Sequence, residues 1–486
     1  MNKSWIIIIS LLFIYTIGFV VFYPSIPTIS DEAYYLLQAK LFSEGNITSA
    51  VINPETGEYI QKLGGHYPIG TSLFIAPFYY IFGFKGAYLL PLIMLILTVL
   101  VTAKWIFEQG YSPLFALFIL GYPSCLVMGR IPMSGLPSAF LVGFGCWLFW
   151  RGIKGNEIYW FLSGFIAGVS LLFREMNPIL FAPLFLGTLI RREKNCKYLI
   201  IGGIIGLSFR LLSSYVVFGD IFFIRTSQQT LETFRFDSTI LINFILYPVA
   251  LLIFIPGGIL WSLSYKGERR FELITTVILF ISILLIHETS AHFTSPAKAI
   301  LNHTRLFIPL LPILVFQMAE VVPRFWNRLI TKIRDAKFAS HLSIGVIYLW
   351  LILLAVGSFG VHWGFSRWTE NKVRLRDTIY ENIPEGSVIL TNRRSTIKYI
   401  SPLFGNHIVR EIRSLKESSI EKIIHGYGEL YIVLHKRFDS EFWEQKNLEN
   451  EKVVQSIYPV PILLIDEKIS HEDKLLIWHV KRKKNK

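Results

Sequence analysis

The sequence predicts a polytopic α-helical membrane protein of about 11 transmembrane helices, with interfacial helices and a small C-terminal extracytoplasmic α/β domain. Hydrophobic residues make up 52% and charged residues 17% of the 486 residues, a combination typical of a chain with many membrane spans. Apolar runs long enough to span a bilayer recur up to residue 362, and after that point short alternating runs replace them.

The first apolar run, WIIIISLLFIYTIGFVVFY, is too long for a signal-peptide core and has no AxA-type cleavage site, so we expect it to stay as a signal anchor. Windows of apolar residues along the chain predict spans at 5–24, 86–105, 112–128, 137–150, 158–173, 177–190, 198–218, 242–264, 271–287, 305–322 and 343–362.

The apolar segment 66–84, HYPIGTSLFIAPFYYIFGF, decides the orientation of the chain. Pro68, Gly70 and Pro77 interrupt it, so it is either a span or an interfacial helix. If it lies on the surface, the basic loops around Arg151, 191–197, 266–270 and 324–337 all fall on one side, which the positive-inside rule makes cytoplasmic. We therefore predict an interfacial segment in a multi-pass cytoplasmic (inner) membrane protein, with its functional groups on the external face.

The predicted organisation has two parts. Residues 1–362 form a transmembrane module whose external loop, 25–85, carries interfacial helices, and residues 363–486 form an extracytoplasmic α/β domain. In the second part we expect helices at DTIYENI and SIEKIIHGY and strands at SVILTN, HIVREI, ELYIVLHK and LLIWHVKR.

Other motifs exclude some functions. Cys125, Cys146 and Cys196 have no CxxC spacing, and the His spacing in HETSAH (287–292) does not put two imidazoles on one helical face, so neither a disulfide framework nor a zinc site is expected. The terminal KRKKNK is read as a solvated charge run, and no nucleic-acid partner is expected.

Two adjacent carboxylates, Asp31 and Glu32, begin a predicted amphipathic helix just after the first span. Capping of that helix by Ser30 or Asp31 is one interpretation. A general base that removes a proton from an acceptor is the second, and a metal ligand is the third, although no DxD spacing is present.

Further polar residues lie at the external ends of the predicted spans. Clustered guanidinium groups there would bind a phosphate bidentately, and aromatic residues beside them would form a wall for an apolar substrate. The candidate substrate-binding residues are His66, Tyr67, Arg130, Arg174, Glu175 and Arg305, with Lys298 and His303 as additions.

The order of these features resembles the C-type (GT-C) membrane glycosyltransferase superfamily, nearest to its protein O-mannosyltransferase and aminoarabinose transferase branch. The resemblance rests on one span, SDEAYY, an interfacial YPxG segment, many spans and the late RLFIPLLP, and it extends to about residue 322. It implies transfer of a sugar from a polyprenyl-phosphate (dolichyl-phosphate-type) donor to a protein, lipid or glycan acceptor outside the cytoplasmic membrane, by a mechanism that inverts the sugar.

The resemblance also implies roles for individual residues. It makes Asp31 the general base and Glu32 its support, and it puts HYPIG in the family's interfacial substrate-binding segment. Arg130 matches the arginine before the fourth span and Arg305 the arginine that opens RLFIPLLP, which suggests a contact with the carrier phosphate; Arg174 and Glu175 correspond more weakly.

One departure bears on the mechanism. Relatives often have an Asp a few residues after the position of Arg130, where this chain reads IPMSGLPS. No cofactor is therefore required by the pattern, and dependence on a divalent metal stays open.

Two other classes of function remain as alternatives. A transporter or flippase of lipid-linked glycans also needs many spans and external charges, and Arg210 is the main charge deep within a predicted span. A non-catalytic envelope scaffold with an external α/β domain is the third class.

Overall fold

The computed structural model describes residues 3–53, 56, 58–63, 67–221, 239–255, 257–286, 304–330, 336–392, 403–404, 407–411, 423, 430–437, 452, 462–468 and 473–480. The chain divides into two compact units. The first comprises Met1–Tyr23, His66–Phe74 and Tyr88–Trp363, and the second comprises Pro24–Gly65, Ile75–Ala87 and Gly364–Lys486.

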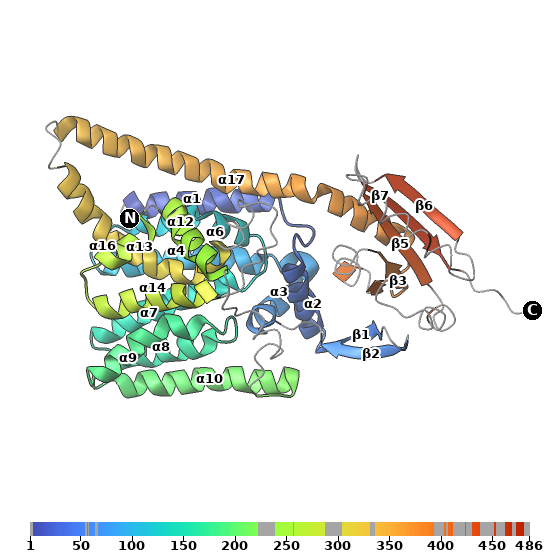
Figure 1. Ribbon diagram of the computed structural model, residues 1–486, viewed down its shortest axis with the longest axis horizontal. Coiled ribbons are helices and arrows are strands. Elements are labelled where there is room, and N and C mark those ends of the chain that lie inside the picture. Colours follow the sequence, from blue (N-terminus) through green and yellow to red (C-terminus); the bar gives the residue numbers. More distant parts are fainter. Residues whose placement is uncertain are drawn as a thin grey trace, which may run out of the picture. The chain divides into compact units, whose positions relative to one another are not determined.

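The first unit is helical, as Figure 1 shows. Its helices are α1 (Lys3–Val21), α4 (Leu89–Glu108), η1 (Pro113–Ala116), α5 (Leu117–Gly121), α6 (Pro123–Met128), α7 (Gly135–Ile153), α8 (Glu157–Ser170), α9 (Asn177–Ile190), α10 (Cys196–Phe218), α12 (Thr239–Phe254), α13 (Gly258–Ser264), α14 (Arg270–Ile286), η2 (Arg305–Leu310), α16 (Leu311–Ile330) and the first part of α17 (Ala336–Asn382).

Within the described residues, six helices are long and apolar enough to cross a membrane: Lys3–Val21, Leu89–Glu108, Gly135–Ile153, Cys196–Phe218, Arg305–Arg328 and Gly345–Asn382. Every other predicted span also coincides with a helix or with a run of shorter helices. The polytopic helical fold class predicted from the sequence is confirmed.

Two predicted spans are interrupted. The window 112–128 is three short helices, because Pro113 and Pro123 each begin a new one and Tyr122 between them is extended. The window 242–264 breaks before Gly257, whose φ of 88° lies in the left-handed region. Hydropathy could not locate these breaks, because short and long helices bury the same apolar residues.

Helix α8 packs against both α7 and α10 (Figure 1). Its contact with α10 is made by glycines: a Cβ on Gly202 would lie 2.0 Å from the carbonyl oxygen of Phe161, and one on Gly206 would lie 2.3 Å from that of Phe165. Small residues are typical where membrane helices approach backbone to backbone. This packing fixes the loop between α8 and α9, which carries two of the predicted site residues.

Charged side chains pair at the end of the first unit that holds the α7–α8 connection. Glu108 accepts hydrogen bonds from Arg151 and Trp147 and forms an ion pair with Lys104. A second group joins the α9–α10 loop to the start of α14, where Arg269 pairs with Glu193. These basic clusters belong to the loops predicted to be cytoplasmic, and the cytoplasmic orientation stays a prediction.

The second unit contains a helix and a hairpin from the loop after α1. The helix is α2 (Ser30–Ser43), and β1 (Thr48–Ile52) pairs antiparallel with β2 (Tyr59–Leu63). Helix α2 begins where the sequence predicts it, but its Tyr35, Leu36 and Ala39 are buried within the protein. The hairpin was not predicted, because neither strand alternates regularly.

Helix α3 (Gly70–Gly86) covers most of the predicted interfacial segment. It is kinked at Gly83, whose φ is 64°. Its first residues belong to the first unit and its later ones to the second.

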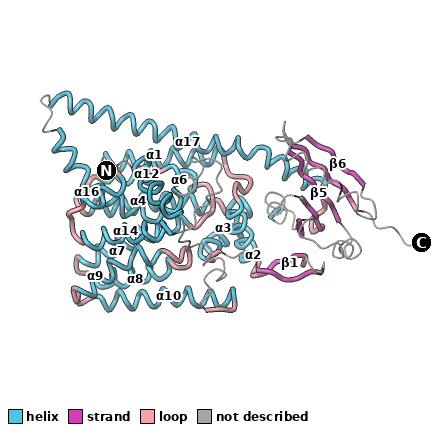
Figure 2. Tube along the Cα trace, viewed as in Figure 1, coloured by secondary structure: helices cyan, strands magenta, loops and turns pink. Residues whose placement is uncertain are grey.

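The C-terminal sheet has the strand order β4–β3–β5–β7–β6. Figure 2 draws its strands in magenta, as it does those of the β1–β2 hairpin. The strands are β3 (Val388–Thr391), β4 (Ile408–Glu411), β5 (Leu430–Arg437), β6 (Ile462–Lys468) and β7 (Asp473–His479). Strands β3, β4 and β5 are parallel, whereas β7 runs antiparallel to both β5 and β6.

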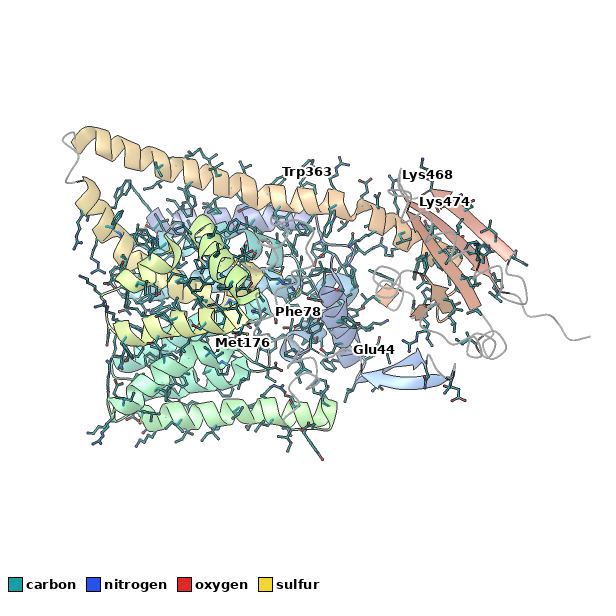
Figure 3. The ribbon with its side chains drawn as sticks, in the orientation of Figure 1. Glu44, Phe78, Met176, Trp363, Lys468 and Lys474 are labelled. Carbon is teal, nitrogen blue, oxygen red and sulfur yellow. The ribbon has the colours of Figure 1, made fainter. Side chains whose placement is uncertain are left out.

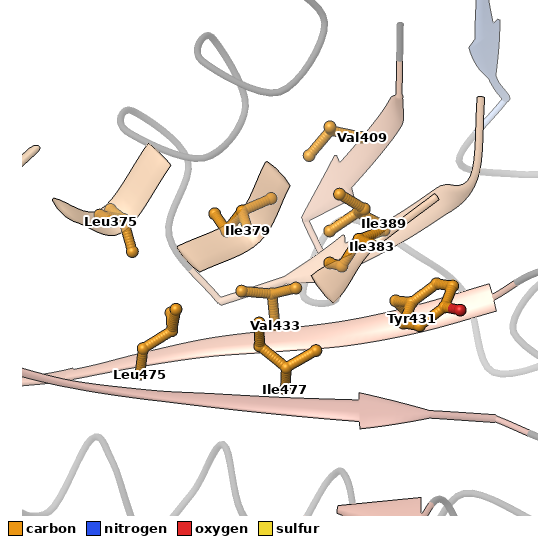
Figure 4. Packing of buried hydrophobic residues seen from close by; sticks show 9 residues of the cluster. All are labelled: Leu375, Ile379, Ile383, Ile389, Val409, Tyr431, Val433, Leu475 and Ile477. Atoms are coloured by element: carbon orange, nitrogen blue, oxygen red, sulfur yellow. The ribbon is translucent and has the colours of Figure 1, made fainter. Parts of the chain in front are cut away.

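The last part of α17 covers one face of this sheet. Figure 4 shows Leu375 and Ile379 of α17, and Ile383 directly after it, packed against a buried set of sheet residues: Ile389, Val409, Tyr431, Val433, Leu475 and Ile477. The other face buries Val388, Leu390, Leu430, Ile432, Leu434 and Leu476. Both faces are therefore apolar, as expected for strands with parallel neighbours.

The four strands predicted in this region are present, and β6 was missed. Its ILLIDEK mixes three large apolar residues that stay about half exposed with acidic ones, so it does not alternate as a covered strand does. The predicted helix at DTIYENI is the end of α17, and SIEKIIHGY lies outside the described residues except for Ile423.

Candidate functional site

Glu32 caps the start of α2 in the second unit. Its Oε2 accepts hydrogen bonds from the backbone N–H and the hydroxyl of Thr28, each at 2.6 Å, and a longer one from the N–H of Ile29 at 3.4 Å. The side chains of both Glu32 and Thr28 are buried. A carboxylate at this position also interacts favourably with the positive end of the helix dipole. Through these hydrogen bonds Glu32 stabilises the first turn of α2.

Asp31 stands in the same first turn but is not buried as Glu32 is. Its side chain is half-buried, and Oδ1 lies 3.4 Å from the hydroxyl of exposed Ser30. Adjacent helical residues point in directions about 100° apart, so the inward capping of Glu32 turns Asp31 toward a different side of α2. Asp31 thus stands at the N-terminus of α2 in surroundings different from those of Glu32, and its role as a base remains a prediction.

The other end of α2 carries a half-buried cation. Burial lowers the pKa of Lys40, while the carboxylates of Glu44 and Glu385 act in the opposite direction. Both acids belong to the same unit as Lys40, and their charges favour its protonated form.

Arg130 lies in the first unit, after α6, and only 3% of it is exposed. Its Nη1 lies 2.7 Å from Nδ1 of His362, and its Nη2 donates to the carbonyl oxygen of Phe22 at 3.1 Å. A guanidinium group only donates, so Nδ1 must accept and the proton of a neutral His362 is on Nε2. Arg130 therefore joins the end of α1, the end of α6 and the middle of α17.

Arg305 begins η2 and is half-buried. The residue before it, Thr304, is fixed to α6: Tyr122 donates its hydroxyl to the Thr304 carbonyl oxygen at 2.8 Å, and the hydroxyls of Ser124 and Thr304 are 2.6 Å apart. Ile308 of η2 meets Gly135 at the start of α7. The segments that carry Arg130 and Arg305 are thus anchored to the same group of helix ends.

The predicted YPIG and LLFRE motifs meet in the first unit. The N–H of Gly70 donates to the carbonyl oxygen of Leu172 at 2.8 Å, and the rings of Phe74 and Phe173 are 5.1 Å apart. A Cβ at Gly70 would lie 2.7 Å from the Leu172 oxygen, so this contact requires a glycine. Two motifs about a hundred residues apart in the sequence therefore pack together.

The residues that follow this contact are Arg174 and Glu175, in the loop before α9 that Met176 marks in Figure 3. Glu175 pairs with Arg210 of α10, Oε1 to Nη2 at 3.7 Å. Arg210 is buried within α10, whose Ile204, Leu212 and Val216 are exposed. A charge in such a helix needs a partner, and sequence reasoning noted the arginine but missed its pairing with Glu175.

Buried polar residues link this loop to α7. Asn177 donates from Nδ2 to the hydroxyl of Ser138 at 3.1 Å and to the carbonyl oxygen of Ser170 at 2.9 Å. The loop of Arg174 and Glu175 is therefore held to α7, the helix that follows Arg130. Five candidate residues, namely Tyr67, Arg130, Arg174, Glu175 and Arg305, lie on connected segments of the first unit.

Some predictions fall elsewhere. His66, Lys298 and His303 lie outside the described residues. Asp31 and Glu32 belong to the second unit. Over the described ranges, no three His, Cys, Asp or Glu side chains are grouped as metal ligands would be.

No protein-family model and no curated protein sequence matches the chain. Among solved structures, the fold is similar to the aminoarabinose transferase ArnT from Cupriavidus metallidurans bound to undecaprenyl phosphate, with a TM-score of 0.66 and 12% identity over 99% of this chain and 98% of that one. The apo state of the same protein gives a TM-score of 0.65, also at 12% identity, over 98% of each chain.

The Archaeoglobus fulgidus oligosaccharyltransferase in its apo form is a third structural relative. Its TM-score is 0.52 at 11% identity, over 88% of this chain and 69% of that one. These proteins are GT-C glycosyltransferases. The fold implied by the order of sequence motifs is therefore confirmed: the chain has a GT-C-like architecture.

Proposed function

We propose that this GT-C-like membrane protein is a glycosyltransferase that moves a sugar from a polyprenyl-phosphate carrier to a protein, lipid or glycan acceptor on the external face of the membrane. The observation that carries the proposal is the structural similarity to ArnT, which extends over 99% of this chain. That ArnT structure has undecaprenyl phosphate bound. The order of SDEAYY, YPIG and RLFIPLLP supports it independently.

In this proposal Asp31 is the general base. Its carboxylate takes the proton of an acceptor hydroxyl or amine as the acceptor atom bonds to the anomeric carbon of the sugar. The bond between that carbon and the carrier phosphate oxygen breaks, and the phosphate departs with the electron pair. Attack opposite the departing phosphate inverts the anomeric carbon.

The departing carrier phosphate needs cations. We assign this task to Arg174 and Arg305, which are half-buried at the connected helix ends of the first unit, and we assign Tyr67 and Glu175 of the same unit as further substrate-binding residues. The Nη atoms of Arg130 donate to His362 and Phe22, so we give Arg130 the part of supporting this region. Glu32 has a similar supporting role, because its hydrogen bonds with Thr28 hold the helix turn that carries Asp31.

The test is mass spectrometry of envelope lipids, glycans and glycoproteins from cells that lack the gene and from cells complemented with variants. We expect one sugar to be lost with the gene, to return with the wild-type gene and to stay absent with Asp31→Asn. The matched control is Glu44→Gln, which removes the same charge from the exposed far end of α2 and should restore the sugar.

Insertion of each variant is checked by its amount in the membrane. Full rescue by Asp31→Asn would remove the base assignment. An unchanged sugar profile in cells that lack the gene would favour a transporter of lipid-linked glycans or an envelope scaffold instead.

A further inference from the structure

The last part of α17 makes two kinds of contact within the second unit. Leu375 and Ile379 pack on the C-terminal sheet. Lys372 and Arg376 are four residues apart and so lie above one another on the helix. These two cations contact the segment that leads into α2.

Both cations bind backbone carbonyl groups of that segment. Lys372 donates from Nζ to the carbonyl oxygen of Thr28 at 2.6 Å, and Arg376 donates from Nη1 to that of Ser25 at 2.8 Å. The two hydrogen bonds join residues that are 344 and 351 positions apart in the sequence, respectively. Hydrogen bonds from charged donors are about twice as strong as neutral ones.

The two long side chains are also held in place by aromatic rings. The ammonium of Lys372 lies 4.9 Å from the ring centre of Trp368, and the guanidinium of Arg376 lies 5.1 Å from that of Phe404. Such contacts reduce the freedom that a lysine or arginine would otherwise lose on binding a carbonyl group.

Thr28 connects this contact to the start of α2. Its carbonyl oxygen accepts from Lys372, while its N–H and hydroxyl donate to the carboxylate of Glu32. Glu32 is the neighbour of Asp31 and fixes the first turn of the helix. A continuous series of hydrogen bonds therefore runs from α17 through Thr28 to the turn that carries Asp31.

We propose that Lys372 and Arg376 are positioning residues that set the first turn of α2, so that the C-terminal sheet helps, through α17, to hold the turn that carries Asp31. This inference rests on the proposed function for its consequence, since the turn matters to catalysis because Asp31 is the base. The hydrogen-bonded series itself does not depend on that function.

The first experiment is hydrogen–deuterium exchange of the purified full chain in lipid nanodiscs. Lys372→Met should speed exchange of the amides in residues 26–34 about tenfold, because a half-buried charge-assisted hydrogen bond is lost. Lys372→Arg, which keeps a donor, should restore most of the protection. Arg374→Met is the matched control, because Arg374 is 61% exposed and pairs with Glu370 of its own helix.

Exchange in 26–34 that is unchanged by Lys372→Met, or raised equally by Arg374→Met, would overturn the proposal. If Lys372→Met speeds exchange throughout the chain, Arg376→Met is measured instead. It should speed exchange in residues 26–34, and Arg374→Met should not.

The second experiment measures the sugar product in cells complemented with the same variants. We expect Lys372→Met to lower the yield at least about tenfold and Lys372→Arg to return it, as for a residue that orients a catalytic group. Normal yield with Lys372→Met, where Asp31→Asn gives none, would refute the positioning role. Normal yield with Asp31→Asn as well would instead refute the assignment of Asp31 as the base, and an unchanged sugar profile without the gene would refute the proposed function; both would leave the exchange result standing.

Discussion

The contact between Arg130 and His362 predicts a measurable coupling between α6 and α17. Arg130→Met would leave His362 Nδ1 and the Phe22 carbonyl oxygen without the guanidinium. Each buried group left unsatisfied costs about 1–3 kcal/mol, and relief of a buried charge offsets part of this, so we expect a loss of about 2–4 kcal/mol in the free energy of unfolding.

The second single variant is His362→Leu. The ring of His362 is fully buried and lies 4.5 Å from that of Tyr15, so its removal loses both packing and the acceptor for Arg130. We expect a cost of about 2–4 kcal/mol. In the double variant both Arg130 and His362 are absent, so neither is left without the other. The loss of unfolding free energy in the double variant should therefore be smaller than the sum of the two single losses by at least about 1 kcal/mol.

The assay is unfolding of the purified chain by titration with a denaturing detergent, followed by tryptophan fluorescence. Arg367→Met is the control, since Arg367 is 69% exposed on the same helix and should change the free energy by less than about 0.5 kcal/mol. Strict additivity of the two single variants would refute the coupling. A neutral effect of Arg130→Met would refute the structural role itself.

Two further predictions concern the packing of each unit. Gly206→Val should lower the free energy of unfolding by more than about 2 kcal/mol, because the added Cβ would lie 2.3 Å from the Phe165 carbonyl oxygen at the α8–α10 contact. Gly203→Ala is the control and should be close to neutral, because the nearest atom to its Cβ is 3.8 Å away. Equal thermal midpoints for the two variants would contradict this prediction. Ile389→Ala should cost about 2–5 kcal/mol and expose the C-terminal region to limited proteolysis, whereas Ile462→Ala on the 46% exposed edge should not; equal cleavage would contradict the assigned core.

Much of the helical architecture could be predicted from apolar runs. A membrane span must form its backbone hydrogen bonds within itself, so it is a helix of about 20 consecutive, mostly apolar residues. The breaks at Tyr122 and Gly257 could not, because proline and glycine mark where a helix can stop without deciding whether it does. The end of α17 was read as a separate short helix, because its charged residues conceal that it continues the last span.

The candidate site was predicted in part. Asp31 and Glu32 were recognised as a pair, but their different surroundings depend on which way α2 packs, and so the sequence could not separate the buried cap from the half-buried acid. Lys372 and Arg376 gave no sign of a role, since two basic residues four apart on a charged helix are ordinary surface residues until a partner is known. The pairing of Arg210 with Glu175 could not be predicted either, because it depends on how α10 packs beside the loop before α9.

Composition and apolar run length by themselves determined that the chain is a polytopic helical membrane protein with a C-terminal α/β region, and the order of its motifs gave the resemblance to the GT-C superfamily. Composition and run length can be read locally, because hydrophobic length and period act over a few turns of chain. Only the tertiary structure decided that YPIG meets LLFRE and that α17 holds the segment before Asp31, because a contact across 344 residues arises from packing and leaves no mark on either segment alone.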